Sequence, residues 1–135
     1  MPTRLPLLML PLLMLLAGAC NPGKHVSDRD VAMVTAEHVA ELIDRDDVVV
    51  VDVRSRRQYE AGHLPGAIHL PLPEMAADDQ RLAAARAIIV YGPEPPSRLA
   101  WAGTKKLMRL GYRRVAQFPG GVEAWELARR EQEAG

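Results

Sequence analysis

Two short aliphatic runs stand in the middle of this 135-residue chain, Val48–Val53 and Ala87–Tyr91. Neither run alternates regularly between polar and apolar residues, so both suit strands that are covered on both faces, as in a parallel sheet. Parallel strands need crossover connections, and segments with apolar residues at helical spacing lie around these runs. The sequence therefore predicts an α/β protein with helices on both faces of the sheet.

The other expected elements follow from caps and turn residues. Thr35 and Ser97 are candidate helix N-caps, and Gly111 is a candidate helix stop. We expect further strands at 67–70 and 115–118, a single helical turn at 58–61, helices at about 36–44, 98–110 and 122–130, and partial helix within 74–86.

Residues 1–19 are typical of a secretory signal peptide. One cation, Arg4, precedes an apolar core from Leu5 to Leu16, and small residues stand directly before Cys20. The apolar run is shorter than the ~20 residues of a membrane-spanning helix, and Pro11 interrupts it. We therefore expect cleavage, with an uncleaved N-terminal anchor as the alternative.

The segment Leu16–Cys20 resembles the lipobox of bacterial lipoproteins. The resemblance implies acylation of Cys20, a lipid anchor in the bacterial cell envelope and, from Asn21, an outer-membrane location facing the periplasm. Residues 20–33 would then be a lipidated N-terminus and a polar tether. The alternative is a soluble secreted protein in which Cys20 is a free thiol, although an unpaired thiol is a liability in an oxidising compartment.

Charge and cysteine content exclude several classes of function. Removing residues 1–19 takes away Arg4, leaving 16 of the 17 basic residues against 17 acidic ones. Without a block of like charge, neither nucleic acid nor an anionic membrane is expected as the main partner. Cys20 is the only cysteine, so no internal disulfide can form, and the four histidines lack metal-ligand spacing. We expect no metal and no cofactor.

Several blocks follow one another in a characteristic order: Val51–Arg54, Tyr59-Glu60, Gly62–Ile68, Ile88–Tyr91, Leu110–Tyr112, Pro119–Gly121 and Ala124-Trp125. In order and spacing they resemble the rhodanese-like domain. The resemblance covers residues 34–130, leaves 131–135 as a C-terminal tail, and implies a three-layer fold with a five-stranded, mostly parallel sheet flanked by helices. Its structural motif would comprise Asp52, Gly62, His63, Pro65, Gly66, Gly120, Gly121 and Trp125.

In active members of that family, the loop after the strand matching 87–91 begins with the catalytic cysteine, in the pattern Cys-x-x-Gly-x-Arg-Ser. That cysteine accepts sulfane sulfur as a persulfide and passes it to an acceptor. Here the loop reads Gly92, Pro93, Glu94, Pro95, Pro96, Ser97, Arg98, with glycine at the cysteine position. The prolines have no N–H, and Glu94 adds negative charge, so the loop offers few donors to an anionic substrate. Ser97 has no histidine near it in sequence to act as a base, and we expect no catalytic residue.

Charged residues elsewhere allow two interpretations. Arg54 and Arg98 could line a residual anion pocket, or Asp52 and Arg54 could form an ion pair that fixes the loops, which we favour because a buried ionisable group needs a partner. Structural roles are expected for His63 and His69. The basic positions Lys105, Lys106, Arg109, Arg113 and Arg114 are expected to form an exposed face.

These features favour a catalytically inactive, membrane-tethered module that binds an unidentified envelope protein. The first alternative is an enzyme, either a thiosulfate or sulfane sulfurtransferase using a nucleophile from outside its own loop, or a phosphatase-like relative. The second is a structural envelope protein with the fold as a soluble head. The sequence identifies neither the partner nor the oligomeric state.

Overall fold

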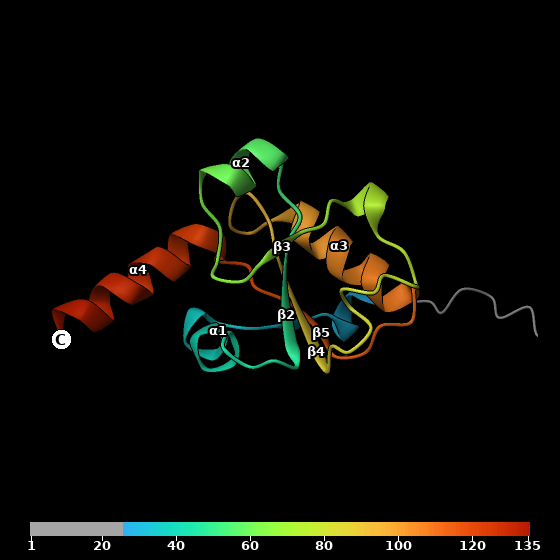
Figure 1. The fold of residues 1–135 in the computed structure, drawn as a ribbon, viewed down its shortest axis with the longest axis horizontal. Helices are drawn as coiled ribbons and strands as arrows, with labels where there is room; N and C mark the ends of the chain where they lie inside the picture. Colours follow the sequence, from blue (N-terminus) through green and yellow to red (C-terminus); the bar gives the residue numbers. More distant parts are fainter. Residues whose placement is uncertain (1–25) are drawn as a thin grey trace, which may run out of the picture.

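The computed structural model describes residues 26–135, so the expected signal peptide, Cys20 and residues 21–25 lie outside the described residues. The fold is a parallel sheet in the order β1-β5-β4-β2-β3, with helices on both faces (Figure 1). Its strands are β1 (Ala32–Met33), β2 (Val48–Asp52), β3 (Ile68–His69), β4 (Ala87–Tyr91) and β5 (Val115–Gln117). The helices are α1 (Ala36–Leu42), α2 (Arg56–Ala61), α3 (Arg98–Arg109) and α4 (Gly121–Ala134), with short 3-10 turns η1 (Asp28–Asp30) and η2 (Leu72–Glu74). The predicted α/β architecture with a five-stranded sheet is confirmed.

Successive side chains of the central strands point to opposite faces of the sheet, so the core is divided into two clusters. On one face of the sheet, Val51 packs in a cluster with Leu107 of α3. On the other face, Val50 packs in a cluster with Val39 of α1 and Trp125 of α4. Both faces of the central strands are thus covered, which explains why their sequences are apolar almost throughout.

Side-chain caps fix the starts of α1 and α3. The Ser97 hydroxyl oxygen accepts a hydrogen bond from the Ala100 N–H at 3.1 Å, and the Thr35 hydroxyl oxygen accepts one from the His38 N–H at 3.4 Å. Each bond satisfies a backbone donor that has no partner within the first helical turn. Both caps were predicted from the sequence.

Residues 74–86 contain no α-helix, which corrects the prediction of partial helix there. The segment forms the end of η2 followed by turns. The Asp79 carboxylate accepts hydrogen bonds from the backbone N–H of Arg81 and from its guanidinium, at 2.9 and 2.7 Å. Such local side-chain bonds compete with helical hydrogen bonding, so the alanine content of the segment did not decide its structure.

The described N-terminal segment, residues 26–33, is part of the fold, and this corrects the predicted tether. Its strand β1 forms one edge of the sheet by pairing with β5. Val26 and Val31 are buried, and the Asp28 carboxylate binds the ammonium of buried Lys105 at 2.6 Å. The segment is polar overall, so its two buried valines gave no periodic pattern from which to predict a strand.

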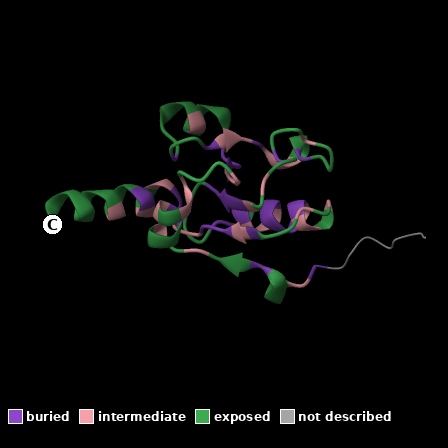
Figure 2. Ribbon diagram, turned by 60° about the horizontal axis from the view of Figure 1, so that its bottom comes forward, coloured by how far each residue is buried: buried purple, intermediate pink, exposed green. Residues whose placement is uncertain are grey.

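At the other end of the chain, α4 continues to Ala134, so the predicted C-terminal tail at 131–135 is almost entirely helical. Trp125 anchors the inner part of α4 in the core. The outer part projects beyond the body of the domain (Figure 1) and is exposed (Figure 2). None of the helices in the described part of the chain is long and apolar enough to cross a membrane.

Candidate functional site

The loop between β4 and α3 stands at the carboxyl end of a central strand, where ligands bind in open α/β sheets. Gly92, which follows β4 directly, is buried, and so is Ser97, which caps α3. Pro93, Glu94, Pro95 and Pro96 form the exposed part of the loop between them. The loop is thus attached at two buried points and presents its prolines and Glu94 to solvent.

The Ser97 side chain occupies the space beside Gly92. A Cβ atom built on Gly92 would lie 2.8 Å from the Ser97 Cβ and 3.2 Å from the Ala100 Cβ, and it would collide directly with the Ser97 hydroxyl oxygen. Ser97 is itself held in place, since its carbonyl oxygen accepts a hydrogen bond from the buried Gln117 amide at 3.1 Å. No side chain fits at residue 92 unless Ser97 moves.

A second glycine approaches the same loop from α4. Gly121 has a φ of +58°, and a Cβ atom built on it would lie 3.2 Å from the Gly92 carbonyl oxygen. Glycine adopts this left-handed conformation at no steric cost, so the chain can turn into α4 close against the loop. The backbone around Gly92 is therefore closely packed on two sides.

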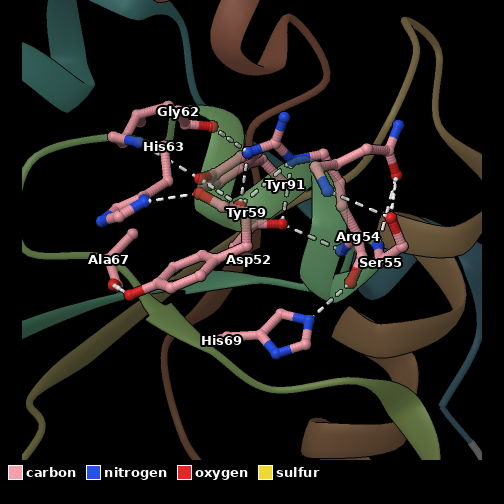
Figure 3. Close-up of polar contacts among 11 residues, drawn as sticks. Asp52, Arg54, Ser55, Tyr59, Gly62, His63, Ala67, His69 and Tyr91 are labelled. Atoms are coloured by element: carbon pink, nitrogen blue, oxygen red, sulfur yellow. Dashed lines mark hydrogen bonds and ion pairs between the residues drawn. The ribbon is translucent and has the colours of Figure 1, made fainter.

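A buried polar network lies beside this loop (Figure 3). The guanidinium of Arg54 binds the Asp52 carboxylate at 2.7 Å and the Gly62 carbonyl oxygen at 2.6 Å. The Tyr91 hydroxyl donates to Asp52 at 2.6 Å and accepts from the Leu64 N–H at 3.2 Å. The predicted ion pair between Asp52 and Arg54 is therefore present, and it ties the end of β2 to the end of β4 and to the loop around Gly62.

Burial and hydrogen bonding set the protonation of this network. Burial, followed by the hydrogen bond to Asp52, raises the pKa of the Tyr91 hydroxyl well above its ordinary value. Burial opposes the positive charge of Arg54, but the hydrogen bonds and attraction of Asp52 outweigh it and raise the guanidinium pKa. The network thus holds a neutral tyrosine and a charged arginine, and neither group is poised to exchange a proton near neutral pH.

The two histidines of this region make contacts within the fold (Figure 3). The His63 ring stacks on Tyr59 with 3.9 Å between ring centroids, and its Nδ1 lies 2.8 Å from the Tyr59 carbonyl oxygen. The His69 Nε2 lies 2.7 Å from the Arg54 carbonyl oxygen. The Tyr59 hydroxyl donates to the Ala67 carbonyl oxygen at 2.7 Å, which closes the turn that holds Pro65 and Gly66.

The two candidate residues of a residual anion pocket have different surroundings. The Arg54 guanidinium is buried against Asp52 and Gly62, as described above. Arg98 is exposed and lines a hollow of about 260 Å³ together with Met33 and Trp101. Arg54 does not line that hollow. The structure therefore gives Arg54 a place in the scaffold and Arg98 a place on the surface.

The surroundings of Tyr91, Lys105 and Lys106 were not predicted from the sequence. Tyr91 is paired in register with Asp52 across neighbouring parallel strands, and a buried tyrosine hydroxyl at a strand end needs such a partner. Lys105 was expected on an exposed face but is buried, with its ammonium 4.4 Å from the centroid of the Trp101 ring. Lys106 also departs from that face, because its ammonium donates to the Leu72 carbonyl oxygen at 2.6 Å.

Comparisons with known proteins agree with this architecture. Residues 35–128 match the family model described as the rhodanese-like domain. The chain is 29% identical over 99 residues to thiosulfate sulfurtransferase GlpE of Pseudoalteromonas translucida, covering 73% of this chain and 92% of that protein. It is 35% identical over 92 residues to the HTH-type transcriptional regulator Rv0324 of Mycobacterium tuberculosis, covering 66% of this chain but only 40% of the regulator.

The fold is similar to the crystal structure of the BH2092 protein from Bacillus halodurans. The TM-score is 0.66 at 28% identity, and the match covers 75% of each chain. The family model matches most of the chain, and the sheet order and the motif positions agree with it. The chain therefore belongs to the rhodanese-like domain family.

Proposed function

We propose that this protein is a catalytically inactive, rhodanese-like lipoprotein of the bacterial envelope, which binds another envelope protein. The lipid would be carried by Cys20, and the fold would face the periplasm from the outer membrane. No cysteine occurs after Cys20, so the domain has no thiol of its own with which to carry sulfur.

The observation that carries the inactive assignment is the packing of Ser97 against Gly92. In active relatives the first residue of this loop is the sulfur-carrying cysteine, as the resemblance implies. Here the corresponding side-chain space is filled by the Ser97 hydroxymethyl group, which also caps α3. A thiol-bearing side chain at residue 92 would therefore need space that Ser97 occupies.

The surroundings of the loop support the same proposal. Three of its exposed residues are prolines without an N–H, and Glu94 brings a negative charge toward any anionic donor. Beside the loop, Met33 and Leu99 are 68% and 38% exposed. An exposed proline loop flanked by apolar side chains suits contact with another protein better than binding of a small anion.

A sulfurtransferase remains the second candidate. Relatives such as GlpE are named thiosulfate sulfurtransferases, and this chain covers 92% of that protein at 29% identity. In this alternative, the thiol would come from a partner protein docked at the loop. Mixing the purified protein with a thiol-bearing partner would then be required for turnover.

The first experiment measures thiosulfate:cyanide sulfurtransferase activity of the full chain and of its Cys20→Ala variant. We expect both to remain at the background rate, because no thiolate lies in the fold. Turnover well above background by the Cys20→Ala protein would refute the inactive assignment. A cyanide-labile sulfur on any residue of that variant would refute it equally.

The second experiment tests the packing argument with three further variants in the Cys20→Ala background: Gly92→Cys, Gly92→Cys with Ser97→Gly, and Ser97→Gly alone. We expect little activity from Gly92→Cys because the new side chain collides with Ser97. The double variant should bind sulfur more readily but remain slow, since the prolines still withhold donors. Full activity of Gly92→Cys alone would show that neither packing nor donor count limits the loop, and Ser97→Gly alone controls for the lost cap.

Lipidation is tested independently by feeding a radioactive fatty acid to a bacterial host that expresses the chain. We expect label in the wild-type protein and none in Cys20→Ala. Equal labelling of both, or of neither, would contradict the proposed anchor.

A further inference from the structure

A hollow of about 510 Å³ lies where the described chain begins. Val26 lines it, together with Tyr112, Arg113 and Arg114. The two arginines directly precede β5, and both are exposed. Because the strands are parallel, this end of the sheet is opposite the end that carries the loop at 92–98.

The charges at this hollow are predominantly positive. Within residues 26–135, neither Arg113 nor Arg114 forms an ion pair. Asp30 also lines the hollow, and its carboxylate accepts hydrogen bonds from the backbone N–H and the hydroxyl of Ser27, each at 2.9 Å. Two unpaired guanidinium groups therefore face solvent beside one carboxylate that already has partners.

The distance from Cys20 limits how far this hollow can be from a membrane anchor. Six residue steps separate Cys20 from Val26, and a fully extended chain spans at most about 3.6 Å per residue, or about 22 Å in all. A domain of this size has a radius of gyration of about 13 Å. An anchor at Cys20 thus keeps the face that contains Val26 within reach of the lipid headgroups.

We propose that the Arg113–Arg114 hollow docks onto the phosphate groups of anionic phospholipids in the membrane that anchors the chain, an inference that rests on the proposed N-terminal anchor. Guanidinium groups bind phosphate oxygens in bidentate geometry. Two arginines are too few to recruit a nearly neutral protein from solution. When the domain is already anchored to the membrane surface, docking is an intramolecular step, and two charges are enough to bias the orientation of the domain.

Docking by this face would direct the loop at 92–98 away from the bilayer. The loop lies at the opposite end of the parallel sheet, so a partner could reach it without competing with lipid. The membrane contact and the proposed protein contact therefore use separate ends of the same domain.

The test uses the full chain in vesicles of phosphatidylcholine alone or with phosphatidylglycerol. Hydrogen–deuterium exchange is followed in residues 110–114. We expect slower exchange in the anionic vesicles, and loss of this difference in an Arg113→Gln, Arg114→Gln variant. Two interfacial arginines correspond to about a 30-fold change in the docking equilibrium. The matched control, Arg129→Gln with Arg130→Gln, removes the same charge from the exposed outer part of α4 and should leave exchange at 110–114 unchanged.

Equal exchange in both kinds of vesicle, or full protection in the Arg113→Gln, Arg114→Gln variant, would overturn the inference. Protection produced by inorganic phosphate on phosphatidylcholine vesicles at constant ionic strength would show a phosphate site and overturn the assignment to lipid. Fatty-acid labelling of the same preparation reports on the anchor. Labelled protein without lipid-dependent protection refutes only the docking surface, whereas unlabelled protein refutes the anchor.

Discussion

Replacing Tyr91 with phenylalanine removes one hydroxyl group that serves two buried partners. The Leu64 N–H would lose its acceptor, which costs about 1–3 kcal/mol for a buried donor. Asp52 would lose one charge-assisted hydrogen bond but keep those from Arg54. Because these effects share one network and are not additive, we expect Tyr91→Phe to lower the free energy of unfolding by about 3 kcal/mol.

Tyr112→Phe is the matched control for this substitution. The Tyr112 hydroxyl also donates one hydrogen bond, to the Ala76 carbonyl oxygen at 2.6 Å, and accepts one, from the Asp79 N–H at 3.2 Å. Its partners are neutral backbone groups nearer the surface, where water can replace the hydroxyl. We expect this control to cost about 1 kcal/mol or less.

Urea unfolding monitored by circular dichroism measures both losses. With a slope near 2 kcal/mol per molar urea, Tyr91→Phe should lower the midpoint by about 1.5 M at an unchanged slope. Our assignment of the network as a stabilising scaffold would be refuted if Tyr91→Phe cost no more than Tyr112→Phe.

Further predictions concern pH, the N-terminal segment and the approach of α4 to the loop. Folding raises the pKa of Tyr91, so the folded chain holds this proton more tightly than the unfolded chain, whose tyrosines titrate near pH ~10. This contribution to the free energy of unfolding should be complete below about pH 10 and decline above it by up to about 1.4 kcal/mol per pH unit. Urea midpoints measured across pH 8–11 test this expectation. The same decline in the Tyr91→Phe variant would contradict it. Asp28→Asn leaves the buried Lys105 ammonium without its carboxylate, whereas Lys105→Met leaves only an exposed carboxylate. We therefore expect Asp28→Asn to lower the free energy of unfolding, measured in urea, by about 1–2 kcal/mol and by more than Lys105→Met does. The reverse order would argue against a role for Asp28 in pairing the buried ammonium. Gly121→Ala should lower the free energy of unfolding by about 1–2 kcal/mol, because alanine is strained at a φ of +58° and its methyl group crowds the Gly92 carbonyl oxygen. An unchanged thermal unfolding midpoint would show that the turn can relax.

The sequence predicted the sheet well because its central strands are buried on both faces. The continuous valine run at 48–51 leaves no solvent face, and its short length and β-branched residues favour a covered parallel strand. Caps were equally predictable, since a serine or threonine before a helical pattern satisfies local donors whatever the tertiary structure. The Asp52–Arg54 pair followed from the requirement that buried charges have partners.

Features that depend on contacts between distant segments could not be predicted in this way. The burial of Lys105 depends on Asp28, which lies 77 residues earlier and in a segment interpreted as a tether. The packing of Ser97 beside Gly92 depends on the path of the loop between them, which residue type alone does not determine. Strand β1 has only two residues and derives its stability from β5 and from the buried Val26 and Val31, so no local pattern marked it.

Strand β1 has a practical consequence for anyone who trims this protein to its family-matched segment, residues 35–128. That cut deletes β1 and turns β5 from an inner strand into an open border, with backbone amides and carbonyls ready to recruit a strand from another molecule. The shortened domain would consequently tend to self-associate through β5, and such oligomers would result from the deletion of residues 26–34.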